Sequence, residues 1–519
     1  MKQNFVQGAM ILVVAGLITR GLGTIYRIFL SRYLGAEAIG IYQMAFPTLI
    51  MLITIVTAGL PIAVSKLVAE ADAKHDPYLI KRILRTSLGI VMLVAIVVSS
   101  LFYFLIPLLT KYLLTDERVY LTLLAIVPIV PIISVSAILR GYFQGKQNMI
   151  PTAISNIIKT IFRMIAGMFL SLKFLPLGVE YAAFGAMLGM IVGEIAGFII
   201  LVAQYFFSKK GVKRPTVPLP ENRNALFNNI ARIAVPVTTS SIIGSLAYFI
   251  EPSVVANSLA LAGIPTGTAT ALYGQLAGMA LLIITFPTVI TSSLGQSLIP
   301  AISEAAAKKN VTKIYKRLHQ ALNIAYIIGL PSSVLLFVLA NPLAELLFNA
   351  KEVGHLIKII SPFAIFLYIQ RPLAATLQGL DRAKDSMTNT IIGAVVKTLA
   401  IVFLASRPSL GIDGVAMAIN IGMLLVTVLH FRSVIHIIGY TIQVRPILSI
   451  TGSALTTGYI AYYIMFHSLA KLSQGISLLA ATAISIVAYI YILLFLKVIK
   501  KQDFEKIPWL GSKITKILP

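Results

Sequence analysis

The stretch EYAAFGAMLGMIVGEIAGFIILVAQYFF, residues 180–207, has a single charged side chain after its first residue, Glu194. A helix that crosses a bilayer needs about 20 mostly apolar residues, and this run is longer. Its glycines recur every four residues, at Gly185, Gly189, Gly193 and Gly197. Because that spacing follows one face of a helix, we expect the glycines to pack against a neighbouring helix. Direct contact with a substrate is the alternative.

The whole chain shares this apolar character. Of its 519 residues, 58% are hydrophobic and 12% are charged, and the mean hydropathy is +0.91. Soluble domains average about 25% charged residues, which excludes an ordinary soluble protein. The residue alternation typical of barrel strands is absent from the sequence. These features predict an all-α, multi-pass protein of the cell membrane.

About fourteen spans fit the apolar runs. The predicted spans are 6–30, 37–65, 83–109, 119–139, 151–172, 180–207, 226–255, 267–300, 318–340, 355–378, 386–405, 412–431, 446–467 and 476–496. The first run has no short core and cleavage site, so we expect a retained span and not a signal peptide. Lysines and arginines gather in alternate loops, which predicts cytoplasmic N- and C-termini.

An internal repeat divides these spans into two halves. FPTLI at 46–50 returns as FPTVI at 286–290, and LPIAVS at 60–65 returns as LIPAIS at 298–303. The shared order predicts two six-helix lobes in a parallel repeat, as in transporters with a site between their repeats. The predicted segments are an N-terminal lobe at 1–207, a cytoplasmic linker at 208–225, a C-terminal lobe at 226–435, and two appended helices with a basic tail at 436–519.

Pro47 and Pro287 occupy equivalent places in the repeat. A proline inside a helix removes an N–H donor and kinks the helix. Each is therefore a candidate hinge for its lobe, and a static adjustment of helix shape is the alternative.

Composition and motifs exclude several classes of function. The net charge of +25 is explained by the basic cytoplasmic loops, so no nucleic-acid partner is expected. The absence of cysteine excludes thiol catalysis, cysteine-bound metals and disulfides. GYFQGK at 141–146 is one residue short of a nucleotide-binding loop, and the six histidines lack paired metal-ligand spacing. We expect no enzymatic activity, no cofactor and no metal.

Charged residues inside the spans are the candidate site, because charge in a bilayer is unfavourable unless it faces a cavity or a partner. Arg20 and Arg27 are seven residues apart, which places them on one helix face. Guanidinium groups bind phosphate oxygens in pairs, so this cationic cleft suits a phosphate or pyrophosphate. For Arg27, an ion pair with Glu251 that latches the lobes is an equal alternative. Arg371, beside Pro372, is either a further cleft residue or a loop partner.

Arg163 and Glu194 lie at similar depth in the fifth and sixth predicted spans. We expect a structural ion pair between them, and a proton or sodium site is the alternative. Lys159 is shallow enough for its ammonium group to reach the cytoplasmic surface.

Four long runs resemble a known family. They are TRGLGTIYRIFLSRYLGAEAIGIYQ at 19–43, GLPIAVSKLVAEA at 59–71, LRGYFQGKQNMIPTAIS at 139–155 and RPSLGIDGVAMAI at 407–419. Together they look like the stage V sporulation protein B family, polysaccharide-transport proteins of the multidrug/oligosaccharidyl-lipid/polysaccharide flippase superfamily, which are related to MurJ-type lipid II flippases. The resemblance implies a two-lobe, alternating-access fold with fourteen helices. It also implies transfer of an undecaprenyl-pyrophosphate-linked saccharide across the cytoplasmic membrane, for cell-wall or spore-cortex peptidoglycan.

The residue-level match to MurJ-type flippases is partial. RGLG at 20–23 matches the motif that opens their cavity, but their second arginine position holds Tyr26 here, and the arginine follows at Arg27. Residues 40–57 lack the carboxylate and arginine of their second helix, so other lipid-linked glycans stay open as cargo. The rival functions are a cation-coupled drug exporter and a non-transporting scaffold for cell-wall synthesis. Membrane lipid and cell-wall synthesis proteins are the expected partners, and the coupling ion stays open.

Overall fold

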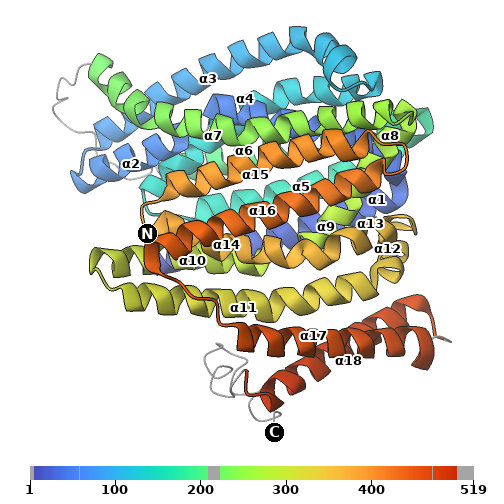
Figure 1. Ribbon diagram of the computed structural model, residues 1–519. Coiled ribbons are helices and arrows are strands. Elements are labelled where there is room, and N and C mark those ends of the chain that lie inside the picture. Colours follow the sequence, from blue (N-terminus) through green and yellow to red (C-terminus); the bar gives the residue numbers. More distant parts are fainter. Residues whose placement is uncertain (1–4, 58, 209–222, 470–471, 499–519) are drawn as a thin grey trace. The chain divides into compact units, whose positions relative to one another are not determined.

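The computed structural model describes residues 5–57, 59–208, 223–469 and 472–498 (Figure 1). The chain is helical through these residues, and no strand occurs among them. Twelve of the described helical runs are long and apolar enough to cross a membrane. The predicted all-α membrane architecture is therefore confirmed. Most of the predicted linker, the basic tail and both chain ends lie outside the described residues.

The chain divides into two compact units. The first is Met1–Gly278 with Ala405–Ile412, and the second is Met279–Leu404 with Asp413–Pro519. The boundary between the units follows Gly278 and not the predicted linker at 208–225. The reason is that α7 (Arg223–Leu261) and α8 (Thr266–Tyr273) pack against α1 (Phe5–Thr57) in the first unit. The two repeated lobes stay a prediction from the sequence.

The first unit contains α1 and the elements that follow it as far as α8. They are α2 (Leu60–Ala73), α3 (Pro77–Leu108), η1 (Leu109–Leu113), η2 (Glu117–Val119), α4 (Tyr120–Gly145), α5 (Ile150–Phe174), η3 (Leu175–Leu177) and α6 (Val179–Ser208). Within α1, Gly35 breaks the helix with a φ of +80°, a conformation that glycine adopts without strain. The break separates the first two predicted spans, and Pro47 lies inside the second of them.

The glycine stripe of α6 packs against α5. A methyl group at Gly189 would overlap the backbone of Gly167, and one at Gly193 would lie 2.6 Å from the carbonyl oxygen of Lys159. At Gly197 the same surface is fixed by a hydrogen bond, in which Ser155 Oγ donates to the Gly197 carbonyl at 2.8 Å. The predicted packing role of the stripe is therefore confirmed, and it brings the two helix backbones close together.

The second unit consists of the remaining elements. They are α9 (Leu281–Ile284), α10 (Thr288–Ala307), α11 (Val311–Val338), α12 (Ala340–Phe348), α13 (Val353–Ile360), η5 (Ser361–Phe363), α14 (Ala364–Gly379), α15 (Ala383–Ala405), α16 (Ile412–Ile438), α17 (Val444–Tyr463), η6 (Ile464–Ser468) and α18 (Gln474–Phe495). The last two long helices pack beside α11 (Figure 1). The buried Tyr489 hydroxyl of α18 donates to the Ile327 carbonyl of α11 at 2.9 Å.

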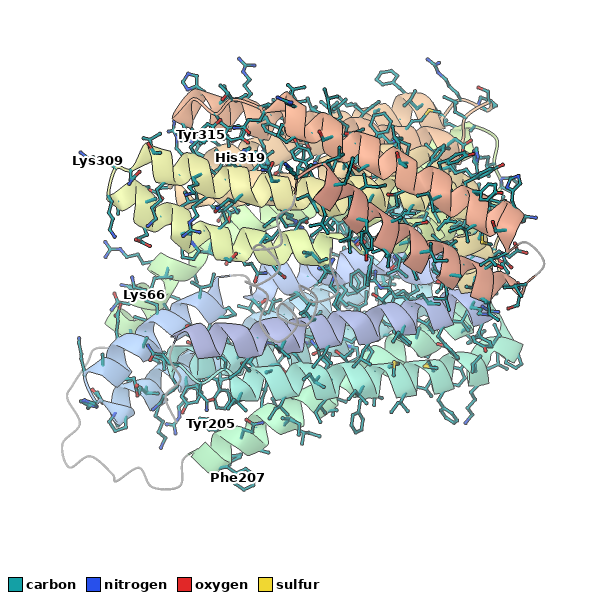
Figure 2. The ribbon with its side chains drawn as sticks, turned by 90° about the horizontal axis from the view of Figure 1, so that it is seen from below. Lys66, Tyr205, Phe207, Lys309, Tyr315 and His319 are labelled. Atoms are coloured by element: carbon teal, nitrogen blue, oxygen red, sulfur yellow. The ribbon has the colours of Figure 1, made fainter. Side chains whose placement is uncertain are left out.

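The start of α11 is tied to the segment that follows α16. Tyr315 Oη donates to the Thr441 carbonyl at 3.0 Å, and His319 Nδ1 lies 3.1 Å from Tyr440 Oη. Figure 2 shows Tyr315 and His319 near the end of this unit that also carries Lys309. These contacts anchor the chain just before it enters the appended helix pair.

The predicted eighth span is not one helix. After α8 the chain forms a π-helical segment, η4 (Gly274–Ala280), then α9 and a turn before α10. The expectation that Pro287 lies inside a helix is therefore wrong, because Pro287 is the N-cap residue of α10. A proline lacks the N–H donor that a continuous helix needs at that position, so the helix restarts after it.

Candidate functional site

Arg20 and Arg27 lie on the first segment of α1. Arg20 is exposed, and its carbonyl accepts a hydrogen bond from Thr24 Oγ1 at 2.9 Å. Arg27 is half-buried, and its guanidinium carbon lies 5.9 Å from the centroid of the Phe46 ring. This cation–π contact draws Arg27 toward the second segment of α1.

Glu251 of α7 belongs to the same neighbourhood as Arg27. Both residues interact electrostatically with the hydroxyl group of Tyr248. Glu251 also interacts with the buried Tyr273 at the end of α8. These interactions bring Glu251 and Arg27 into one electrostatic cluster, while a direct latch between them stays a prediction.

Glu194 pairs with Lys159 and not with Arg163, which corrects the expected ion pair. Lys159 Nζ lies 3.2 Å from Glu194 Oε1, and the Glu194 side chain is only 8% exposed. Gly197 of α6 lies against Lys159 Cβ, and Gly193 lies against both the Lys159 carbonyl oxygen and Arg163 Cβ. Helix α6 therefore packs across both residues, and the Glu194 carboxylate reaches the Lys159 ammonium group. Lys159 thus supplies the counter-charge for Glu194. Its ammonium group was expected to reach the cytoplasmic surface, and this ion pair was not expected from the sequence.

Arg163 instead contacts α1. Its guanidinium carbon lies 5.7 Å from the centroid of the Tyr26 ring. Its Nη2 lies 3.5 Å from the place that a Cβ would take at Gly23, in the RGLG motif. The guanidinium therefore lies beside the α1 backbone at the RGLG motif.

Arg140 joins this group, although the sequence analysis did not single it out. It interacts electrostatically with both Glu194 and Lys159. The predicted fourth span ends at residue 139, whereas α4 continues to Gly145. Arg140 is therefore a helical residue inside a spanning run. The sequence that follows it contains Gly141 and Gly145, which gave no signal that the helix continues.

The second unit holds Arg371 on α14 and a separate open cavity. Arg371 is exposed, and its carbonyl oxygen lies 3.3 Å from where a Cβ would project at Gly295 of α10. The cavity has a volume of about 220 Å³, and Lys397 and Gln370 are among its lining residues. Gln370 Nε2 already has an acceptor, because it donates to the Met423 carbonyl at 2.8 Å.

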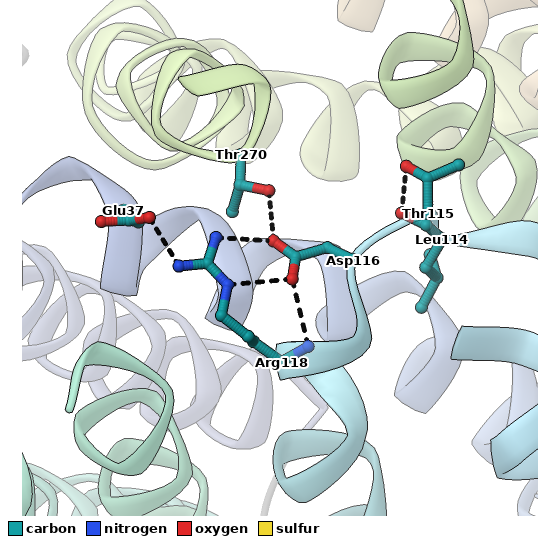
Figure 3. A network of polar contacts seen from close by, with 6 residues as sticks. All are labelled: Glu37, Leu114, Thr115, Asp116, Arg118 and Thr270. Atoms are coloured by element: carbon teal, nitrogen blue, oxygen red, sulfur yellow. Dashed lines mark hydrogen bonds and ion pairs between the residues drawn. The ribbon is translucent and has the colours of Figure 1, made fainter. Parts of the chain in front are cut away.

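A polar network that the sequence analysis missed joins α1, η2 and α8 (Figure 3). Asp116 is 3% exposed, and its carboxylate accepts a hydrogen bond from Thr270 Oγ1 at 2.6 Å. Arg118 donates to the same carboxylate through its backbone N at 3.1 Å, Nε at 3.0 Å and Nη2 at 2.9 Å. Its Nη1 donates to Glu37 Oε1 at 2.6 Å. One guanidinium thus bridges two carboxylates from different elements.

The carboxyl group of Asp116 is held in its charged form. Burial alone would raise its pKa, but the hydrogen bonds from Arg118 and Thr270 outweigh burial and lower the pKa below its ordinary value. Asp116 is therefore ionised at neutral pH. In the predicted topology, Asp116 and Glu37 lie at the outer side of the membrane.

Close backbone packing accompanies this network. Gly40 of α1 faces the carbonyl group of Thr270, and Gly274 faces the carbonyl group of Ala36, with no room for a side chain at either glycine. Gln43 Nε2 donates to the Ala277 carbonyl of η4 at 2.9 Å. The second segment of α1 and the α8–η4 segment are therefore fitted tightly together.

Comparison with known proteins identifies the family. The profile described as "Polysaccharide biosynthesis protein" matches residues 5–305. The chain belongs to the polysaccharide biosynthesis protein family. A second profile, MatE, matches residues 274–404 of this family member.

Two relatives align with nearly the full length of this family member. Stage V sporulation protein B of Bacillus subtilis (strain 168) is 40% identical to it over 99% of both chains. Lipid II flippase MurJ of the same organism is 23% identical, over 95% of both chains. These relatives and the apolar helices show a multi-pass membrane transporter of the multidrug/oligosaccharidyl-lipid/polysaccharide flippase superfamily, and not an enzyme.

Two solved structures show the same fold. Lipid II flippase MurJ in an inward closed conformation has a TM-score of 0.69 and 18% identity, over 93% of this chain and 98% of that chain. A multidrug resistance MATE family transporter in an inward-facing conformation has a TM-score of 0.65 and 18% identity, over 80% of this chain and 94% of that chain. Both likenesses concern the arrangement of helices alone.

Proposed function

We propose that the protein is an alternating-access flippase for an undecaprenyl-pyrophosphate-linked saccharide, lipid II or a related cell-wall or spore-cortex precursor. The cargo class follows from the names of its full-length relatives, stage V sporulation protein B and lipid II flippase MurJ. In this proposal the two repeats are the moving lobes, and both chain ends face the cytoplasm.

The observation that carries the proposal is the contact that α8 makes with α1 and with Asp116, the residue before η2, in the first unit. By the sequence repeat, α8 belongs to the second lobe, yet Thr270 on α8 bonds to Asp116 of the first lobe. This contact lies at the predicted outer side. A lobe pair that is held together at its outer side admits cargo from the cytoplasm, which is the first half of an alternating-access cycle.

Arg20, Arg27 and Arg371 are the proposed contacts for the pyrophosphate. Arginine suits this role because its charge is permanent and its planar fork binds two phosphate oxygens at once. Pro47, inside α1, and Pro287, at the start of α10, are the proposed hinges. Glu251 is proposed to tune Arg27, since both act on Tyr248.

The rival exporter function predicts a different cleft chemistry. A cation-coupled drug exporter needs acidic groups that are free to bind a cationic drug or a coupling ion. The carboxylate of Glu194 is instead held by Lys159 at 3.2 Å. The described charges of this region therefore favour an anionic cargo over a cationic one.

Variants of α1 in reconstituted vesicles test the proposed function. Arg20→Ala should abolish transfer of the lipid-linked saccharide, and Arg20→Lys should keep part of it, since a point charge replaces a bidentate fork. If Arg27 only latches Glu251, the double charge swap should restore part of the loss caused by Arg27→Glu. If Arg27 binds phosphate, the swap should stay inactive. Normal transfer by Arg20→Ala, at equal protein level, would contradict the assigned role of this cleft.

A further inference from the structure

The interior of the first unit carries an unbalanced group of charges. Lys159 pairs with Glu194, and Arg140 and Arg163 both interact electrostatically with Lys159. Glu194 is the single carboxylate among the described residues that act on Lys159. Three cations therefore share one anion, and the group has a formal charge of +2. We name Arg140, Lys159 and Arg163 the inner cation triad.

Such an excess of charge is unfavourable inside a membrane protein. Buried or membrane-embedded cations are stable when they face a cavity, a water path or an anion. The triad residues are half-buried, with 25% of the Lys159 side chain exposed. Glu194 neutralises only one of these three cations.

Two polar atoms beside the triad have no hydrogen-bond partner among the described residues. They are Arg163 Nε and the hydroxyl oxygen of Tyr26, and both atoms are buried. Tyr26 as a whole is 2% exposed, and its ring lies under the Arg163 guanidinium. The Tyr26 hydroxyl lies against Gly167 of α5. Since a donor that is buried without an acceptor is unfavourable, Arg163 Nε indicates an acceptor that arrives from outside the chain.

The triad is arranged as a series of steps along the membrane. Arg140 lies five residues before the end of α4, and Lys159 and Arg163 lie nine and thirteen residues after the start of α5. At about 1.5 Å per residue, they are about 8, 14 and 20 Å from the predicted cytoplasmic ends of their helices. Arg20 lies about one helical turn before Gly23 of α1, and Gly23 lies beside the Arg163 guanidinium. Arg20 is therefore level with the inner part of the triad, and Arg140 is the triad member nearest the predicted cytoplasmic side.

Resting on the proposed function, we propose that the inner cation triad binds the pyrophosphate diester of the lipid-linked substrate beside Arg20. A pyrophosphate diester has two ionised oxygens and a charge of −2, which balances the +2 of this group. Arg140 and Arg163 supply planar forks for its oxygens. Glu194 pairs with Lys159 and so sets the charge of the group at +2. Arg163, which also contacts the RGLG motif at Gly23, joins this site to α1.

Binding measurements on the full-length protein in phosphatidylcholine nanodiscs test this site. The probe is an undecaprenyl-pyrophosphate-linked monosaccharide, with phosphatidylglycerol and inorganic pyrophosphate as comparators. Arg140→Gln and Arg163→Gln should each weaken binding of the probe at least tenfold. The matched control, Arg85→Gln on an exposed position of α3, should change it less than twofold. Equal binding of either comparator would overturn the assignment to a lipid pyrophosphate.

Glu194→Gln separates a binding site from a structural ion pair. Removing the carboxylate raises the charge of the group to +3, so binding of the probe should become at least threefold tighter. Binding that stays unchanged in Glu194→Gln, Arg140→Gln and Arg163→Gln, with thermal unfolding near that of the wild type, would overturn the proposal.

Transport by the same preparations distinguishes failure of the site from failure of the function. If the wild type transports the lipid while the arginine variants bind like the wild type, the site is wrong and the flippase function stands. If the wild type binds the probe through these arginines but transports nothing, the flippase function is wrong and the site stands.

Discussion

Replacing Asp116 with asparagine keeps the shape of the side chain and removes its charge. In the structure this carboxylate is 3% exposed and accepts bonds from Arg118 and Thr270. If the network holds α8 against η2 and α1, then Asp116→Asn should favour the state in which the outer side is open. The expected phenotype is a protein that folds normally but exposes residues between α1 and α8 to the outside.

The size of this effect follows from the exposure of the two partners. Breaking a fully buried ion pair by removing one charge costs about 3 to 5 kcal/mol. The Arg118 side chain is 33% exposed and keeps its bond to Glu37, so solvent reduces the expected loss to about 2 kcal/mol. Since about 1.4 kcal/mol is a factor of ten, the open population should rise about 30-fold.

The absence of native cysteine provides the assay. Ala269 precedes Thr270 on α8 and is 3% exposed, so Ala269→Cys is shielded while the outer side is closed. Its rate of labelling by a membrane-impermeant maleimide, added to intact cells, should rise with Asp116→Asn. Asp72→Asn is the matched control, because Asp72 pairs with Lys146 at 3.0 Å within the same unit but on the predicted cytoplasmic side. Labelling in Asp116→Asn that stays within twofold of the parent would refute the latch.

Three further outcomes are expected. Lys159→Met leaves the buried Glu194 without its ion-pair partner, so the free energy of unfolding should fall by about 3 kcal/mol and the midpoint of thermal unfolding by several degrees. Adding Glu194→Gln should recover most of this loss. Equal midpoints for the single and double variants would contradict the pairing. Gly189→Val should lower the midpoint further than Gly16→Val, because a side chain at Gly189 overlaps Gly167 while Gly16 has open space around it. Because the pKa of Asp116 is below its ordinary value of 3.8, its stabilising effect is complete above that pH and is lost as the pH falls through the lowered pKa. The outside labelling rate at Ala269→Cys, divided by the rate for the same cysteine in the Asp116→Asn background to cancel the pH dependence of the thiolate, should therefore not change between about pH 5.5 and pH 8; a rise of this ratio at pH 5.5 would show that the carboxylate is protonated there.

Sequence patterns predicted the parts of this protein that depend on local composition. The apolar runs predicted the helices, because a bilayer requires about 20 apolar residues in each span. The four-residue period of glycines predicted that α6 packs closely against a neighbouring helix, since small residues permit it, and the structure identifies that helix as α5. Gly35 was not predicted as the break in α1, although its positive φ is a conformation that suits glycine.

Contacts between distant residues were beyond the reach of the sequence. Lys159 and Arg163 are one helical turn apart, and only the register of α6 decided which of them meets Glu194. Likewise, Asp116 and Thr270 are 154 positions apart and meet because α8 packs onto the first half of the chain. Nothing in the local sequence of either residue specifies that partner.

The most direct test of the flippase function is transfer of a fluorescent undecaprenyl-pyrophosphate-linked saccharide across vesicles that contain only this protein. The wild type should move the lipid between leaflets without ATP, since the sequence has no nucleotide-binding loop. The Arg20→Ala and Arg27→Ala double variant, reconstituted at the same protein-to-lipid ratio, should not move it above the rate of empty vesicles. Full transfer by that double variant, or no transfer by the wild type, would contradict the account.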